Sequence, residues 1–173
     1  QHPEGRWSLA GAQPKLALVY DPTADRWGIP TGASPTTHIL KPAIGGLGDF
    51  DINEHLCLSA ARCAGLIAAT TSVHTFAGER ALVVERYDRF VGESDAVIRV
   101  HQEDLCQALS VHPDRKYEVD GGPGAEQLGR LIREAAGHYD AARFFDALAY
   151  SWLVLATDGH AKNYSLLLSG HQV

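Results

Sequence analysis

The residue pattern changes near residue 100, and this change constrains the fold more than any other feature of the 173-residue chain. Before it, short runs of β-branched and alternating apolar residues are separated by turn residues, which is typical of strands. After it, apolar residues recur at helical spacing. The expected strands of the first part are residues 15–20, 36–41, 72–76, 80–86 and 97–100. The sequence therefore predicts an α+β fold with two parts, residues 1–100 and 101–173, and a ligand site where two such parts meet.

Capping and turn residues place the remaining elements. Asn53 is a favourable N-cap residue and Gly65 a favourable stop, so one helix is expected between them. Residues 77–79 are expected to form a three-residue hairpin turn. Helices are predicted for residues 102–110, 124–136 and 141–156, followed by a strand over residues 164–168.

Composition narrows the class of protein. The formal net charge of −6 argues against a general binder of nucleic-acid backbones, which needs a basic face. Cys57, Cys63 and Cys106 lack metal-site or redox spacing, so we expect reduced thiols in a cytoplasmic protein. The longest apolar run, residues 147–156, is too short to cross a bilayer, and no membrane association is expected. The chain does not begin with Met, so we expect it to start inside a longer protein.

The strongest chemical signal is the polar cluster from Asp158 to Asn163, between an apolar helix and an apolar strand. An aspartate followed five residues later by an asparagine is similar to the catalytic loop of phosphoryl-transfer enzymes. There the aspartate accepts the proton of the substrate hydroxyl, and the asparagine oxygen suits Mg²⁺, a cation that prefers oxygen ligands. The alternative is an ordinary solvated loop between a helix and a strand.

Three weaker patterns contain residues that could bind a nucleotide. The small residues between Ser8 and Lys15 would let backbone N–H groups approach phosphate, although small residues before a strand are common. Lys41 ends a strand and Glu54 lies on the following helix, the lysine–glutamate arrangement of kinases. A surface lysine and a first-turn glutamate explain that pattern as well. Residues 85–87 follow an apolar strand. They could form a hinge between two lobes, and a charged strand end is the simpler interpretation.

These motifs, taken in order, resemble the HipA family of bacterial kinase toxins. The matching blocks are Ser-Leu-Ala-Gly-Ala-Gln-Pro-Lys (8–15), Thr-Thr-His-Ile-Leu-Lys (36–41), Asn-Glu-His-Leu-Cys (53–57), Val-Glu-Arg-Tyr-Asp-Arg (84–89), Gln-Glu-Asp-Leu-Cys-Gln-Ala-Leu (102–109) and Thr-Asp-Gly-His-Ala-Lys-Asn (157–163). Lys116-Tyr117-Glu118 and the glycine-rich residues 120–124 also resemble the family. The resemblance extends from Ser8 to about Leu168. Single blocks are ambiguous, but the ordered series is specific.

The resemblance implies a bilobal protein-kinase-like fold related to lipid kinases, incomplete at both ends, with residues 1–100 as the N-lobe and 101–173 as the start of a helical C-lobe. ATP and Mg²⁺ are the implied ligands. Asp158 would be the catalytic base, Asn163 a Mg²⁺ ligand and Ser8 an autophosphorylation site. The residues that would contact ATP are Ala10, Gly11, Ala12, Gln13, Pro14, Lys15, Lys41, Glu85, Arg86, Tyr87, His160, Ala161, Lys162 and Asn163.

The resemblance also implies a serine/threonine protein kinase toxin of a toxin–antitoxin system, a class connected with persistence. Its substrate would be a protein such as an aminoacyl-tRNA synthetase. A DNA-binding antitoxin of HipB type would be its partner, so DNA contact would be indirect.

Two departures from the family keep alternatives open. Pro14 stands where the family commonly has Glu and removes one N–H from the phosphate loop. The family's second metal-binding aspartate would lie beyond Val173, so this segment alone is expected to bind nucleotide poorly and to catalyse little. One alternative is a catalytically dead kinase remnant or antitoxin-binding module. A small-molecule kinase of similar fold is another.

Overall fold

The computed structural model describes residues 13–31, 34–43, 48–92 and 96–168. The chain divides into two compact units, residues 1–99 and 100–173, and each unit is treated by itself.

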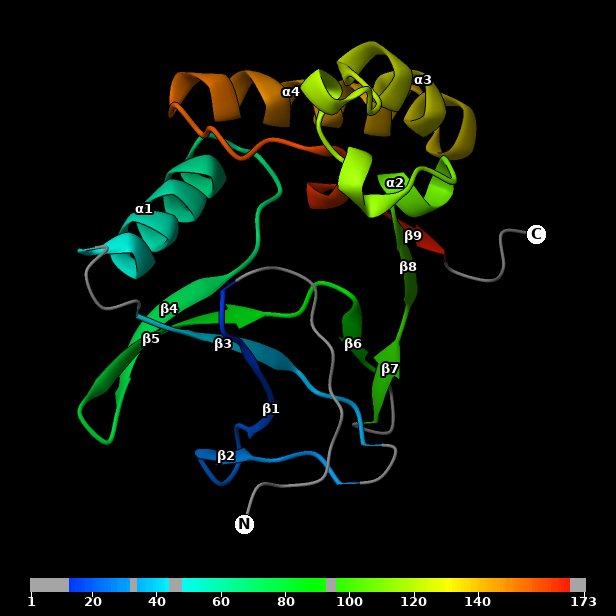
Figure 1. Cartoon of the computed structure of the whole chain (residues 1–173). Helices are drawn as coiled ribbons and strands as arrows, with labels where there is room; N and C mark the ends of the chain where they lie inside the picture. The colour runs from blue at the N-terminus through cyan, green and yellow to red at the C-terminus, as the bar shows by residue number, and fades with distance from the viewer. Residues whose placement is uncertain (1–12, 32–33, 44–47, 93–95, 169–173) are drawn as a thin grey trace. The chain divides into compact units, whose positions relative to one another are not determined.

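An antiparallel sheet of five strands forms most of the first unit as described, in the order β2-β1-β3-β5-β4 (Figure 1). The strands are β1 (Leu16–Asp21), β2 (Arg26–Gly28), β3 (His38–Pro42), β4 (Thr71–Phe76) and β5 (Glu79–Glu85). A separate antiparallel pair comprises β6 (Arg89–Val91) and β7 (Val97–Arg99). The expected strands are present, whereas the sequence reading missed the short strands β2 and β6.

Strand β5 carries the core of this unit. Its residues Ala81, Leu82 and Val83 are buried, as is Leu40 on β3. Strands β4 and β5 form a hairpin that is readily followed in Figure 1. Its turn has two residues rather than three, because Ala77 and Gly78 both adopt positive φ, as a tight turn matched to strand twist requires.

Helix α1 (Phe50–Cys63) lies against β4 and β5. It starts three residues before the expected N-cap Asn53, whose N–H instead donates to the carbonyl of Asp49 at 2.8 Å. It ends as expected, because Gly65 takes the left-handed φ of +85° and the next N–H, that of Leu66, donates back to the carbonyl of Ala61.

The second unit combines a strand pair with helices. Its elements are β8 (His101–Asp104), α2 (Leu105–Ala108), the 3₁₀ turns η1 (Pro113–Arg115) and η2 (Glu118–Asp120), α3 (Ala125–Ala136), α4 (His138–Leu153), the 3₁₀ turn η3 (Ala161–Asn163) and β9 (Ser165–Leu168). The helix α3 and the strand β9 agree closely with the expected elements, whereas α4 begins and ends three residues before the expected range 141–156. The helix predicted for residues 102–110 was wrong at its start, because residues 101–104 form a strand that pairs with β9.

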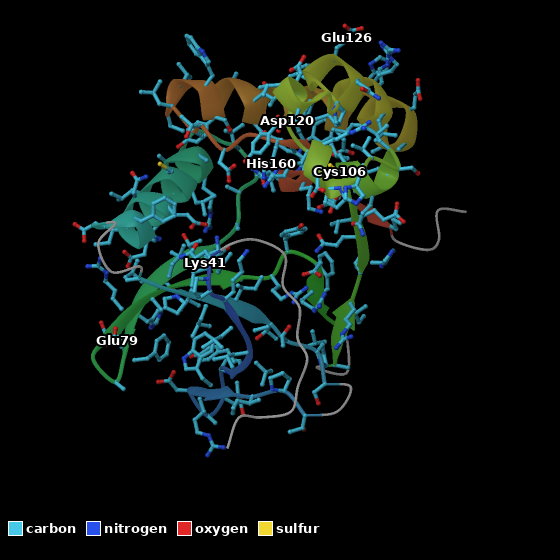
Figure 2. All side chains as sticks on the ribbon, viewed as in Figure 1. Lys41, Glu79, Cys106, Asp120, Glu126 and His160 are labelled. Atoms are coloured by element: carbon cyan, nitrogen blue, oxygen red, sulfur yellow. The ribbon has the colours of Figure 1, made fainter. Side chains whose placement is uncertain are left out.

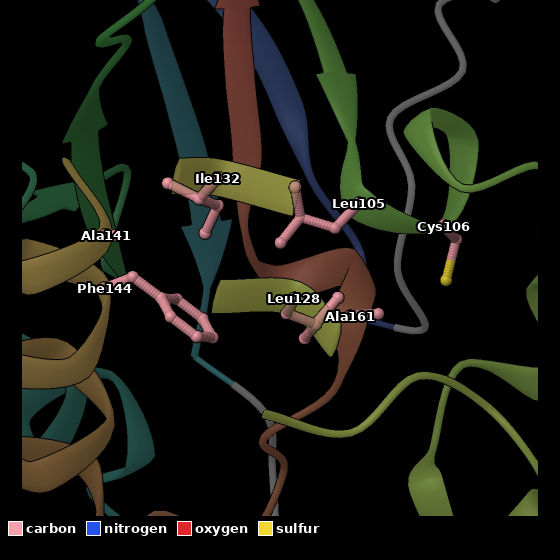
Figure 3. Close-up of a cluster of buried hydrophobic side chains, with 7 residues drawn as sticks. All are labelled: Leu105, Cys106, Leu128, Ile132, Ala141, Phe144 and Ala161. Carbon is pink, nitrogen blue, oxygen red and sulfur yellow. The ribbon is translucent and has the colours of Figure 1, made fainter. Parts of the chain in front are cut away.

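A compact apolar cluster fixes the helices of this unit against the loop that follows α4. Figure 3 shows its members: Leu105, Cys106, Leu128, Ile132, Ala141, Phe144 and Ala161. Ala161 is the first residue of η3 and is only 1% exposed, so this core holds η3 in place. None of the helices in the described part of the chain is long and apolar enough to cross a membrane.

Candidate functional site

Asp158 lies in the loop between α4 and η3, and its side chain is 77% exposed. Two contacts hold it nevertheless. The Tyr117 hydroxyl donates to the Asp158 Oδ1 at 2.6 Å, and the side-chain amide of Asn163 donates to the Asp158 backbone carbonyl. The carboxylate and the main chain of this residue are therefore both fixed. An exposed, oriented carboxylate is what a general base for a substrate hydroxyl requires.

His160, which is labelled in Figure 2, belongs to the same loop. It is almost completely buried, with 7% of its side chain exposed. Its Nε2 is 3.7 Å from the Asp158 Oδ1, and its ring meets the Tyr117 ring edge to face at 4.9 Å. Within the described residues the buried Nδ1 has no hydrogen-bond partner. Such an unpaired buried atom costs free energy. Because the protein itself covers the Nδ1, the nucleotide contact expected of His160 stays a prediction.

Lys162 and Ala161 were expected to contact ATP, and in the structure both contact residues of their own unit. The Lys162 ammonium forms an ion pair with the Asp104 Oδ2 at 2.5 Å, and the Ala161 N–H donates to the Lys116 carbonyl at 3.2 Å. Both groups thus anchor the loop to its own unit. A contact of either residue with ATP stays a prediction.

Asp104, the partner of Lys162, also caps α2. The sequence did not predict that Asp104 supports this loop. Its side chain accepts from the Gln107 N–H, and the Gln107 side chain accepts in return from the Asp104 N–H. Burial alone would raise the pKa of Asp104. The ion pair with Lys162 and the backbone N–H donors of α2 outweigh burial, so the pKa is lowered.

The oxygen donor expected for a cation at this loop is that of Asn163. Because the Asn163 nitrogen donates to a carbonyl, its Oδ1 is the atom that remains to take a metal ion. Among the described residues no group of three or more His, Cys, Asp or Glu side chains could hold a metal. The Asn163 amide oxygen fits Mg²⁺ as one ligand, because Mg²⁺ usually takes few protein ligands and keeps water or phosphate oxygens for the rest.

In the first unit, the expected pairing of Lys41 with Glu54 is confirmed. The Lys41 Nζ lies 2.5 Å from the Glu54 Oε1, and each side chain is about three-quarters buried. Lys15 lies next to Lys41, because Leu16 on β1 is opposite Leu40 on β3. Burial lowers the pKa of Lys15 and the charge of Lys41 lowers it further, whereas Glu54 acts in the opposite direction. Two ammonium groups and one carboxylate thus share this end of the sheet.

A buried ion pair fixes the helix that carries Glu54. Arg80 on β5 donates to both carboxylate oxygens of Asp51, at 2.6 and 2.9 Å, and to Asp49 at 2.8 Å. These hydrogen bonds lower the pKa of the Asp51 carboxyl against the opposing effect of burial. Asp51 and Glu54 are three residues apart, so both project from the same side of α1. The sequence reading did not identify Arg80 or Asp51; only the acidic first turn of α1 hinted at the latter.

The segment expected to form a hinge is a turn braced by Asp88. Arg86 pairs with the Asp88 carboxylate through two nitrogens, at 3.0 and 2.8 Å, and Arg89 adds a contact of 2.5 Å. The N–H groups of Glu85 and Arg86 already donate to backbone carbonyls. The side chain of Arg86 therefore has a structural role, and the adenine contact expected of Glu85, Arg86 and Tyr87 stays a prediction.

The expected phosphate loop is described only in part. Gln13 reaches the Pro42 carbonyl at the end of β3, at 3.4 Å. Ser8, Ala10, Gly11 and Ala12 lie outside the described residues. Pro14 is exposed just before β1.

Comparison with known proteins gives a consistent result. The family model of the HipA-like C-terminal domain matches residues 7–173. Y4mE of Sinorhizobium fredii, whose name proposes a kinase activity, is 38% identical over 94% of this chain and 39% of its own length. The serine/threonine-protein kinase toxin HipA of Shewanella oneidensis is 33% identical over 95% of this chain and 40% of its own length.

The structural comparison leads to the same relative. A solved complex of Shewanella oneidensis HipA with HipB and operator DNA contains a chain of similar fold, with a TM-score of 0.76 and 28% identity. The similarity covers 98% of this chain and 42% of that chain. The present chain therefore spans about two fifths of the length of the relatives it matches.

Proposed function

Because the chain belongs to the HipA-like C-terminal domain family, we propose that it is the nucleotide-binding and base-carrying part of an ATP-dependent serine/threonine protein kinase. The observation that carries this proposal is the exposed Asp158 carboxylate, which is held by Tyr117 and lies next to Asn163. In this proposal the first unit is the N-lobe and the second the start of the C-lobe of a kinase-like fold.

The proposed reaction is an in-line phosphoryl transfer. The oxygen of a Ser or Thr hydroxyl forms a bond to the γ-phosphorus of ATP while the bond between that phosphorus and the β–γ bridging oxygen breaks, which releases ADP. Asp158 accepts the hydroxyl proton through Oδ2, since Oδ1 is occupied by the Tyr117 hydroxyl. Asn163 is the residue that would hold Mg²⁺, which when bound would neutralise charge on the phosphates.

Lys41 supplies positive charge for the ATP phosphates, and Lys15 and the residues before it are the proposed phosphate loop. Glu54 holds the Lys41 ammonium in one position, which limits the loss of side-chain entropy when phosphate binds. His160, in the same loop as Asp158, is a further proposed contact of the nucleotide.

One solved relative supports a proposal for the partner. Since HipA of Shewanella oneidensis has been solved with HipB and operator DNA, we propose that the whole protein binds a HipB-type antitoxin and reaches DNA through it. We further propose a protein substrate, such as an aminoacyl-tRNA synthetase, and autophosphorylation at Ser8.

A transfer assay with γ-labelled ATP tests the reaction class. The full-length gene product that contains this chain would be incubated with Mg²⁺ and either candidate proteins or small alcohols and lipid headgroups. Label in protein supports the proposal, whereas label confined to small molecules supports the small-molecule kinase. Asp158→Gln should abolish transfer and leave ATP binding nearly intact, while Asp146→Gln, at an exposed site on α4, should leave transfer unchanged.

A further inference from the structure

We propose that Tyr117 is a positioning residue for the reaction, acting through its hydroxyl to fix the Asp158 carboxylate. The inference rests on the proposed kinase function and assigns a role to a residue 41 positions away in sequence. Tyr117 does not need to touch ATP or the substrate to act in this way.

The first support is the geometry of the hydrogen bond. At 2.6 Å between Tyr117 Oη and Asp158 Oδ1, it is a short bond from a neutral donor to a charged acceptor, the stronger class of hydrogen bond. The Asp158 side chain is otherwise largely exposed. Without this contact the carboxylate would be free to sample several rotamers, of which only some direct a lone pair at the substrate hydroxyl.

The second support is that Tyr117 is itself held rigidly. Its carbonyl accepts the N–H groups of both Asp120 and Gly122, at 3.1 and 2.9 Å. Its ring packs edge-on against His160, and the Lys116 ammonium lies 4.9 Å from the centre of the ring. A donor on a fixed ring and backbone can orient its acceptor, whereas a mobile donor could only follow it.

The third support is that the two segments are also joined through the main chain. The Lys116 carbonyl accepts the N–H of Ala161, the buried first residue of η3. The segment before η2 and the loop after α4 are thus connected twice, once through backbone atoms and once through the Tyr117 hydroxyl. Removal of the hydroxyl should therefore release the carboxylate while the loop remains in place.

The chain contains a matched control for the substitution. The Tyr20 hydroxyl donates to the Asp25 Oδ1 at 2.8 Å, so it makes the same kind of bond within the first unit. Tyr117→Phe and Tyr20→Phe each remove one hydroxyl and one bond to an aspartate. Only the first should affect the reaction.

The experiment has a structural and a kinetic part, both on the full-length gene product. NMR of protein labelled with ¹³C at the tyrosine ζ carbons, with Tyr117→Phe used to assign the signal, follows the ionisation of Tyr117. The bond to Asp158 raises the pKa of this hydroxyl, chiefly by hydrogen bonding. In Asp158→Ala the Tyr117 pKa should fall back; an unchanged value would show that the bond is absent in solution and would overturn the inference.

In the kinetic part, Tyr117→Phe should lower kcat roughly 10- to 100-fold, as expected for loss of a hydrogen bond to a charged group, with KM for ATP and thermal stability nearly unchanged. Tyr20→Phe should match the wild type. A Tyr117→Phe protein with wild-type or raised kcat, or with only KM changed, would overturn the positioning role alone. A wild-type protein that transfers no phosphate to any acceptor would overturn the proposed function and the positioning role together.

Discussion

Replacement of Gly122 by alanine should disturb the candidate site through the backbone that carries Tyr117. A Cβ added at Gly122 would lie 2.0 Å from the Arg115 carbonyl oxygen and 2.7 Å from that of Tyr117. Both are backbone atoms, so no side chain can rotate away. Because contacts of a Cβ below 3.0 Å are essentially never found, the backbone must move by about 1 Å or more.

The size of the effect follows from that displacement. Overpacking of this kind costs about 1–3 kcal/mol of folding free energy, which should lower the Tm by several degrees. The displaced segment carries Tyr117, and a misplacement of about 1 Å can slow a reaction roughly 100-fold. Differential scanning calorimetry and single-turnover phosphoryl transfer on the full-length gene product measure the two effects.

Gly124→Ala is the matched comparison for this experiment. There the added Cβ would meet the Glu118 Oε1 at 2.5 Å, and this is the end of a flexible side chain that can move aside. Gly124→Ala should therefore behave nearly as the wild type. Equal Tm and equal rate in Gly122→Ala and Gly124→Ala would refute the reasoning, because the backbone clash would then carry no consequence.

Three further predictions concern the ion pairs and the core. Glu54→Gln should raise KM for ATP about tenfold or more with little change in Tm, because the Lys41 ammonium loses the carboxylate that orients it; an unchanged KM in steady-state kinetics would contradict this. Asp104 has a lowered pKa, so its ion pair with Lys162 stabilises the fold above about pH 4 and is lost as the pH falls through the lower folded-state value. Asp104→Asn should thus be less stable at neutral pH and flatten the acid side of a Tm–pH curve; an unchanged curve would exclude the linkage. Leu105→Ala, at a fully buried position, should cost about 2–5 kcal/mol in urea unfolding, and a cost near zero would mean that this core is not as packed as the structure has it.

Local sequence signals predicted much of the fold. The strand that ends at Lys41 is rich in β-branched and apolar residues, and Gly65 supplies the positive φ that ends α1. The Lys41–Glu54 pair could be expected because only a short loop separates the strand from the helix. The periodicity of the second half likewise predicted α3 and α4.

Contacts between distant residues could not be predicted in this way. Residues 102–104 precede helix-forming residues and look like a helix start, yet they pair with β9 more than sixty positions later. Tyr117 and Arg80 are ordinary residues in their local sequence. Each acquires its role from a partner far along the chain, Asp158 and Asp51 respectively. Periodicity and capping carry no information about such pairs.

The most direct test of the central claim is intact-mass spectrometry of the full-length gene product, first treated with phosphatase and then incubated with ATP and Mg²⁺, beside its Asp158→Gln variant. We predict the gain of one phosphate in the wild type, located at Ser8 by peptide mapping, and no gain in the variant. Equal phosphate in both proteins would contradict the role of Asp158 as the base. No phosphate in either, together with no transfer to added proteins, would contradict the kinase function itself.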